Sequence, residues 1–178
     1  YQTITSLKNP PNDATLIAKT LQDAGFSVHL LVDANYRDMR RAIRDFGMSL
    51  DEKSEALFYY AGHGVQYDGN NYLVPVDAKV VYEEDINVES VDLEMVLSKM
   101  QGSRSRVNIV ILDACRNNPF AGRSRSLGQG LAYVSAPTGS LIAYATAPGS
   151  VAFDGVEANS IYSKSLATNI LKKELDIE

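Results

Sequence analysis

A single cysteine and one of two histidines are the side chains best suited to nucleophilic chemistry in this sequence of 178 residues. Cys115 follows the apolar run 107–112, and His63 follows the apolar run 56–61, which places His63 52 residues earlier. A thiolate attacks a carbonyl carbon, and a nearby imidazole can take the thiol proton and return it to a leaving group. The pair therefore indicates acyl transfer, with Cys115 as nucleophile and His63 as general base and acid.

Glycines lie on both sides of the histidine. Gly62 and Gly64 leave room for a substrate backbone, and the main-chain amides of Gly64 and Cys115 are candidate donors to a developing oxyanion. A blander interpretation stays open, in which Cys115 is a small buried hydrophobic residue and His63 a loop histidine. His29 has no matching motif and is predicted to be structural.

The motifs around these residues resemble the caspase-fold cysteine peptidases of the metacaspase and paracaspase branch, in particular prokaryotic orthocaspases. A histidine about 50 residues before an Ala-Cys-Arg sequence is typical of that fold. The resemblance implies a Cys115–His63 dyad, a thioacyl-enzyme intermediate, and an oxyanion hole made of the Gly64 and Cys115 amides. It is carried by His63-Gly64, Asp113-Ala114-Cys115-Arg116, and the stretches 7–14, 71–78 and 144–149.

Three acidic positions predict the specificity. Animal caspases hold a substrate aspartate with two arginines and a glutamine, and the resemblance places Asp13, Asp154 and Asp113 at those positions. Carboxylates would repel an acidic residue and bind a guanidinium through charge-assisted hydrogen bonds, so we expect cleavage after arginine, then lysine. The alternatives are a helix cap for Asp13, a strand-end carboxylate for Asp113 and a turn residue for Asp154.

Two other segments are candidates for contact with substrate. Ala145, Thr146 and Ala147 are expected to form an edge on which an extended peptide adds as a β-strand. The same residues are also typical of a strand followed by a turn, and both descriptions can hold together. The stretch 117–130 is rich in Gly, Ser and Arg and is predicted to be a loop. Arg123 and Arg125 in that loop are candidate sites of self-cleavage. From the predicted specificity, the expected partners are peptides and proteins with exposed Arg or Lys.

Strand-like and helix-like segments alternate along the chain, which predicts an α/β fold. The resemblance implies a caspase-like α/β/α sandwich with a mostly parallel sheet. The site is expected at the carboxyl ends of its parallel strands. We expect a single domain over residues 1–178, with the family's first central strand missing before Tyr1. The predicted helices are 12–24, 36–48, 89–100 and 160–171; the predicted strands are 26–32, 56–61, 107–112 and 140–145, with a β-hairpin at 65–76 standing off the sheet.

Composition excludes several other functions. The net charge of -5 without a basic stripe excludes nucleic acid as substrate, one cysteine excludes an internal disulfide, and no stretch approaches the ~20 apolar residues that cross a bilayer. No cofactor or metal is expected; Glu83, Glu84 and Asp85 are a weak calcium candidate. The predicted location is the cytoplasm, with an export signal upstream of Tyr1 left open, and the oligomeric state is not predicted.

Two rival functions share this fold class. A catalytically silent caspase-fold scaffold or interaction module would typically lack the cysteine or the histidine, and both are present. A doubly wound nucleotide-binding domain would need a glycine-rich phosphate loop, and the sequence contains none.

Overall fold

The computed structural model describes residues 1–115, 120, 131–145 and 158–172. Helices and strands are mixed along the chain, although the first two helices follow each other without the strand that the sequence predicts between them. In chain order the elements are α1 (Pro10–Asp23), α2 (Tyr36–Ser49), β1 (Glu55–Tyr67), β2 (Asn70–Leu73), the 3-10 turn η1 (Glu83–Asp85), α3 (Ile86–Glu89), β3 (Val91–Asp92), α4 (Leu93–Gly102), β4 (Val107–Cys115), β5 (Ser140–Tyr144) and α5 (Ile161–Asn169).

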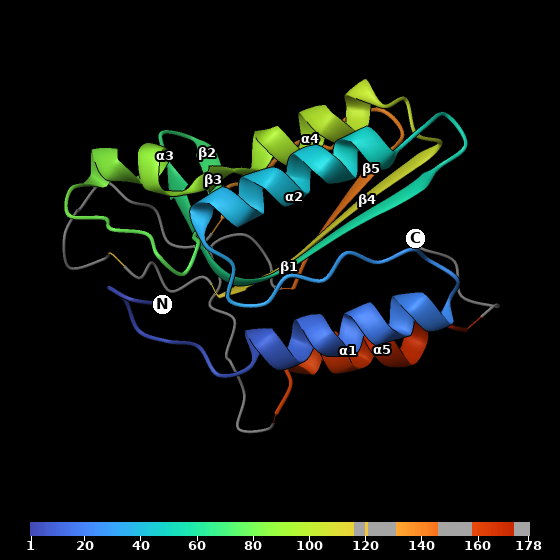
Figure 1. The fold of residues 1–178 in the computed structure, drawn as a ribbon, viewed down its shortest axis with the longest axis horizontal. Coiled ribbons are helices and arrows are strands. Elements are labelled where there is room, and N and C mark those ends of the chain that lie inside the picture. Colours follow the sequence, from blue (N-terminus) through green and yellow to red (C-terminus); the bar gives the residue numbers. More distant parts are fainter. Residues whose placement is uncertain (116–119, 121–130, 146–157, 173–178) are drawn as a thin grey trace.

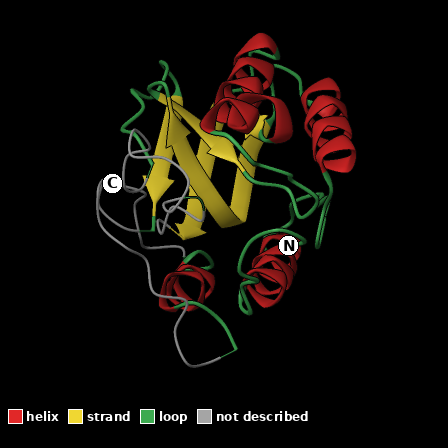
Figure 2. Ribbon diagram, turned by 90° about the vertical axis from the view of Figure 1, so that its left-hand side faces the viewer, coloured by secondary structure: helices red, strands yellow, loops and turns green. Residues whose placement is uncertain are grey.

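The elements form three layers. Helices α2 and α4 cover one face of the sheet, and α1 and α5 lie side by side on the other (Figure 1). Figure 2 shows the same arrangement along the strands, with helices on both sides of the sheet. The α/β/α sandwich predicted from the sequence is confirmed.

The sheet has the strand order β3-β2-β1-β4-β5. Strands β1, β4 and β5 are parallel, while β2 and β3 are added antiparallel at the far end of β1. The predicted hairpin is therefore present, with its turn at Asp68 and Gly69, but it joins the main sheet through β1 instead of standing off it. The parallel part brings the carboxyl ends of β1 and β4 to the same edge.

Helix α1 begins earlier than predicted. Pro10 occupies its first turn, where the missing proline N–H costs nothing, and Ile17, Ala18 and Leu21 bury one face. The helix cap considered for Asp13 is wrong, because the cap position is Asn9. Asp13 is thus a buried residue inside the helix, 2 % exposed.

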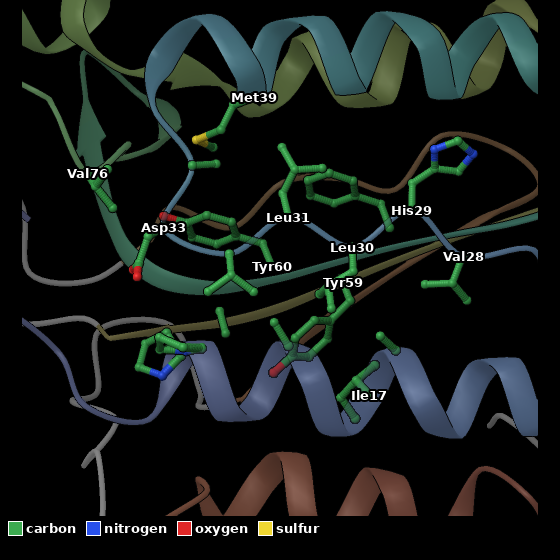
Figure 3. A pocket seen from close by; sticks show the side chains of 18 of the residues that line it. Ile17, Val28, His29, Leu30, Leu31, Asp33, Met39, Tyr59, Tyr60 and Val76 are labelled. Carbon is green, nitrogen blue, oxygen red and sulfur yellow. The ribbon is translucent and has the colours of Figure 1, made fainter.

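The largest correction concerns residues 26–32, which do not form a strand. Their β-branched and apolar side chains predicted one, but a strand also needs a hydrogen-bonding neighbour. A cavity of about 570 Å³ separates this segment from β1, with Leu30 and Leu31 on one side and Tyr59 and Tyr60 on the other (Figure 3). The cavity lies beside residues 57–61 of β1.

Two element boundaries also differ from the prediction. Strand β1 does not stop before the histidine but continues through it to Tyr67, because the hairpin pairing takes over where the parallel pairing ends. Helix α4 begins at Leu93, after the short helix α3 and the two-residue strand β3. His63 is accordingly a strand residue and not a loop residue.

Candidate active site

His63 and Cys115 occupy facing positions on neighbouring parallel strands. They form the last pair in the register of β1 with β4, and strand neighbours lie about 4.8 Å apart. Cys115 is the final residue of β4. Two residues remote in sequence therefore meet at the carboxyl edge of the sheet, where the sequence predicted the site.

Two tyrosine hydroxyls hold the main chain of the histidine. The His63 N–H donates to the hydroxyl oxygen of Tyr1 at 2.9 Å, and the Tyr60 hydroxyl donates to the His63 carbonyl at 2.8 Å. The same carbonyl accepts the Val74 N–H at 3.0 Å. His63 is 4 % exposed, so these bonds fix a buried residue.

The imidazole itself is held by a main-chain carbonyl. His63 Nε2 lies 2.8 Å from the Thr5 carbonyl oxygen, and a carbonyl only accepts, so Nε2 is the protonated nitrogen of the neutral ring. The lone pair that can take a proton is then on Nδ1. The Tyr1 ring packs edge-on against the imidazole at 4.6 Å between centroids, which limits its rotation.

The glycines beside His63 have a packing explanation. A Cβ on Gly62 would lie 2.7 Å from the hydroxyls of both Tyr1 and Tyr60, and its φ of 156° disfavours other residues. A Cβ on Gly64 would lie 2.9 Å from the Leu131 side chain. Glycine at these two positions therefore leaves space for neighbouring side chains of the protein, an explanation for the glycines that the sequence did not suggest.

Asp113 lies in a cluster of hydroxyl groups. Its Oδ2 accepts from Ser160 Oγ at 2.5 Å and from Ser163 Oγ at 2.7 Å, and the Tyr59 hydroxyl lies 3.3 Å away. Asp113 is 8 % exposed. No described Lys or Arg forms an ion pair with this carboxylate. Among the described residues, hydroxyl groups are therefore the donors that hold this buried carboxyl group.

Asp13 reaches the same place from helix α1. Its Oδ1 accepts from the main-chain N–H of Ser160 at 2.9 Å and from Asn159 Nδ2 at 3.0 Å. Ser160 therefore touches both acids, Asp13 through its amide and Asp113 through its hydroxyl. The structure brings these two predicted pocket residues together on the α1 and α5 face of the sheet, next to the His63 edge.

Asp113 affects the pKa of two nearby tyrosines. Burial, followed by the Asp113 carboxylate, raises the pKa of Tyr59 far above its usual value near 10, so that this hydroxyl stays protonated. The same two causes raise the pKa of Tyr162. Tyr59, Ser160 and Ser163 were not singled out from the sequence, where the only signal was a serine, Ser160, at the start of a predicted helix, a residue type typical of an N-cap.

Several predicted site residues lie outside the described residues. They are Asp154, Thr146, Ala147, Arg123 and Arg125. Ala145 is described: it follows β5, and its N–H donates to the Leu112 carbonyl at 3.0 Å. His29 is exposed and lines the cavity beside β1 (Figure 3).

The acidic run has a local structural role. Glu83, Glu84 and Asp85 form η1, where Asp85 accepts the main-chain N–H groups of Val81 and Tyr82, which lowers the pKa of its carboxyl. Within the described part of the chain, no three His, Cys, Asp or Glu side chains are grouped to hold a metal ion. Among the same residues, no helix combines the length and apolar character that a membrane span requires.

Comparison with known proteins adds to this geometry. A family model described as Caspase domain matches residues 1–178. The mucosa-associated lymphoid tissue lymphoma translocation protein 1 of Homo sapiens is 30% identical over 176 residues, 97% of this chain, and the Mus musculus homolog is 30% identical over 170 residues, 93% of it. A probable protease of a Desulfuromonadales bacterium is 27% identical over 123 residues, 65% of this chain. The chain spans 20% of the length of each mammalian relative and 14% of the bacterial one.

Proposed function

The chain belongs to the caspase-domain peptidase family and is similar to its metacaspase and paracaspase branch. We therefore propose that it is a cysteine endopeptidase that cleaves after arginine and, less well, after lysine. The observation that carries this proposal is the meeting of Asp13 and Asp113, two buried carboxylates bonded to one residue, Ser160. Substrate proteins and peptides with exposed Arg or Lys are the partners that this chemistry implies.

In the proposed mechanism, His63 takes the Cys115 proton and the sulfur attacks the scissile carbonyl carbon. The new C–S bond forms a tetrahedral adduct, and the C–N bond breaks as His63 gives the proton to the leaving amine. Water, deprotonated by His63, then hydrolyses the thioacyl-enzyme and restores the thiol. The bond from His63 Nε2 to the Thr5 carbonyl supports this role, since it leaves Nδ1 as the proton acceptor.

The oxyanion of each adduct requires donors that are already in place. We assign the main-chain amides of Gly64 and Cys115 to this role, as the family resemblance implies. Gly64 follows His63 on β1, and Cys115 faces His63 on β4, so both amides belong to the same short stretch of two neighbouring strands. No metal or cofactor enters this scheme.

Specificity follows from charge. Asp113 is buried among hydroxyls, and a bound guanidinium would supply the positive charge that compensates it. Asp154 is proposed as the third acid of this pocket. An aspartate before the scissile bond would meet like charges and be rejected.

The substrate main chain is proposed to add along residues 145–147. Ala145 follows β5, the outermost strand of the sheet among the described residues, and a sheet edge offers unpaired main-chain groups to an extended peptide. Ala145, Thr146 and Ala147 would then align the peptide, while the acids bind the side chain that precedes the cut.

The test is hydrolysis of a fluorogenic peptide ending in arginine, with and without a thiol alkylator, in excess chelator and in millimolar calcium. We expect turnover in chelator, no many-fold rise with calcium, full loss on alkylation, and no turnover by Cys115→Ala. The variant with Cys115 replaced controls for a contaminating peptidase. Wild-type turnover by Cys115→Ala would refute the mechanism, and a folded wild type without turnover would indicate the silent scaffold instead.

A further inference from the structure

Three hydroxyl groups from two elements meet at one oxygen of Asp113. Ser160 and Ser163 come from the start of α5, and Tyr59 comes from β1. All three approach Oδ2, at 2.5, 2.7 and 3.3 Å. No hydrogen bond from a described residue reaches Oδ1 of Asp113. Among these residues, all hydroxyl donors of the carboxylate are therefore on Oδ2.

The direction of each bond follows from donor counting. Ser160 Oγ accepts the Ser163 N–H at 3.0 Å and gives its own proton to Asp113. Ser163 Oγ also gives its proton to Asp113, so it must accept from the Tyr59 hydroxyl, 2.6 Å away. The result is a chain of donors from Tyr59 through Ser163 to Asp113, in which each bond polarises the next.

The same helix start fixes the second acid. The main-chain N–H of Ser160 donates to Asp13, while its hydroxyl donates to Asp113. Helices α1 and α5 lie side by side below the sheet (Figure 1), so the first residues of α5 set the separation of an acid on α1 from an acid on β4. Ser163 is 0 % exposed and does not reach substrate itself.

We propose that Tyr59, Ser160 and Ser163 are positioning residues that orient Asp113 and Asp13 for the planar fork of a guanidinium, and so set the preference for arginine over lysine. This inference rests on the proposed function. A guanidinium needs carboxylate oxygens at fixed places for parallel hydrogen bonds, whereas an ammonium is a point charge that tolerates a looser arrangement. Loosening Asp113 should therefore penalise arginine substrates more than lysine substrates.

The experiment compares Tyr59→Phe and Ser163→Ala with wild type on two peptides that differ only in Arg or Lys before the cut. We expect kcat/KM for the arginine peptide to fall roughly 5- to 30-fold, mostly through KM, and kcat/KM for the lysine peptide to change less than about 3-fold. The ratio of the two values, which a general loss of folded enzyme does not alter, is the deciding readout. The double variant should fall short of the product of the single effects, because both side chains act through one donor chain.

Two variants serve as matched controls. Ser165→Ala removes an exposed serine from the same helix, and Tyr67→Phe removes a phenol from the same strand, both away from Asp113. Both should keep the wild-type ratio. Ser160→Ala is not used as a test, because it also removes the N-cap of α5.

The results distinguish a failure of the positioning role from a failure of the proposed function. If wild type does not cleave after basic residues, the proposed function fails. If wild type prefers arginine but Tyr59→Phe and Ser163→Ala keep the same Arg-to-Lys ratio, only the positioning role is refuted. Tyr59→Phe preserves the ring, so it remains informative if Ser163→Ala does not fold.

Discussion

The hydroxyl of Tyr60 donates a hydrogen bond of 2.8 Å to the main-chain carbonyl of His63 and also reaches the Val74 carbonyl at 3.1 Å. A side chain from the α2 face of the sheet thereby fixes the backbone of a residue whose imidazole contacts Thr5 and Tyr1. The orientation of the proposed base thus depends on a side chain outside the Cys115–His63 pair.

Tyr60→Phe should therefore lower kcat with little change in KM. We expect a loss of roughly 3- to 30-fold, below the ~100-fold that a displacement of 1 Å can cost, and a decrease of about 1 kcal/mol in the free energy of unfolding. Steady-state kinetics and urea unfolding measure the two effects. Tyr67→Phe, on the same strand, is the control; an unchanged kcat in Tyr60→Phe would show that this bond does not position His63.

Asp113→Asn should weaken only the cleavage of basic substrates. It keeps the shape of the side chain but removes the charge that we propose faces the guanidinium, at a cost of about 2 to 5 kcal/mol, or roughly 30-fold to several thousandfold in kcat/KM. Asp154→Asn should act in the same direction, and Asp45→Asn, an exposed residue of α2, should have no effect. Unchanged preference for arginine in both pocket variants would mean that these carboxylates do not bind the substrate.

The sequence predicted the relative position of His63 and Cys115 better than it predicted the surroundings of each residue. Apolar runs before His63 and Cys115 were enough to place both at one sheet edge, because parallel strands align their carboxyl ends. Residues 26–32 were misassigned because propensity says nothing about whether a neighbouring strand is present.

The hydroxyl cluster shows the same limit. The partners of Asp113 lie 47, 50 and 54 residues away in the sequence, and Tyr59 lies 104 residues from Ser163. Local periodicity carries no information about such pairs. Asp13 was open to interpretation as a helix cap until the start of α1 placed it inside the helix.

The raised pKa of Tyr59 predicts how stability depends on pH. Because the folded protein holds this proton more tightly than the unfolded chain, stability is complete below the usual tyrosine value of about 10 and is lost as pH rises above it. At pH 11, Tyr59 should cost about 1.4 kcal/mol of folding free energy, and Tyr59→Phe should remove that loss. Chemical unfolding of both proteins between pH 9 and 11 measures the difference, which would be absent if Tyr59 ionised normally.

Self-cleavage is expected in the stretch 117–130. Arg123 and Arg125 there would suit a site that favours arginine, and they follow the proposed nucleophile closely in sequence. Mass spectrometry of purified protein should show fragments ending at one of these arginines in wild type and none in Cys115→Ala. An active wild type whose chain stays intact after long incubation would contradict this expectation.

We propose that buried carboxylates select the residue before the cut, and a peptide series that varies only that residue tests this role most directly. The measured quantity is kcat/KM of the wild-type protein for Arg, Lys and Asp at that position. We predict the highest value for arginine, a lower value for lysine and essentially no cleavage after aspartate. Efficient cleavage after aspartate, or equal cleavage after all three, would contradict the acidic pocket formed by Asp13 and Asp113.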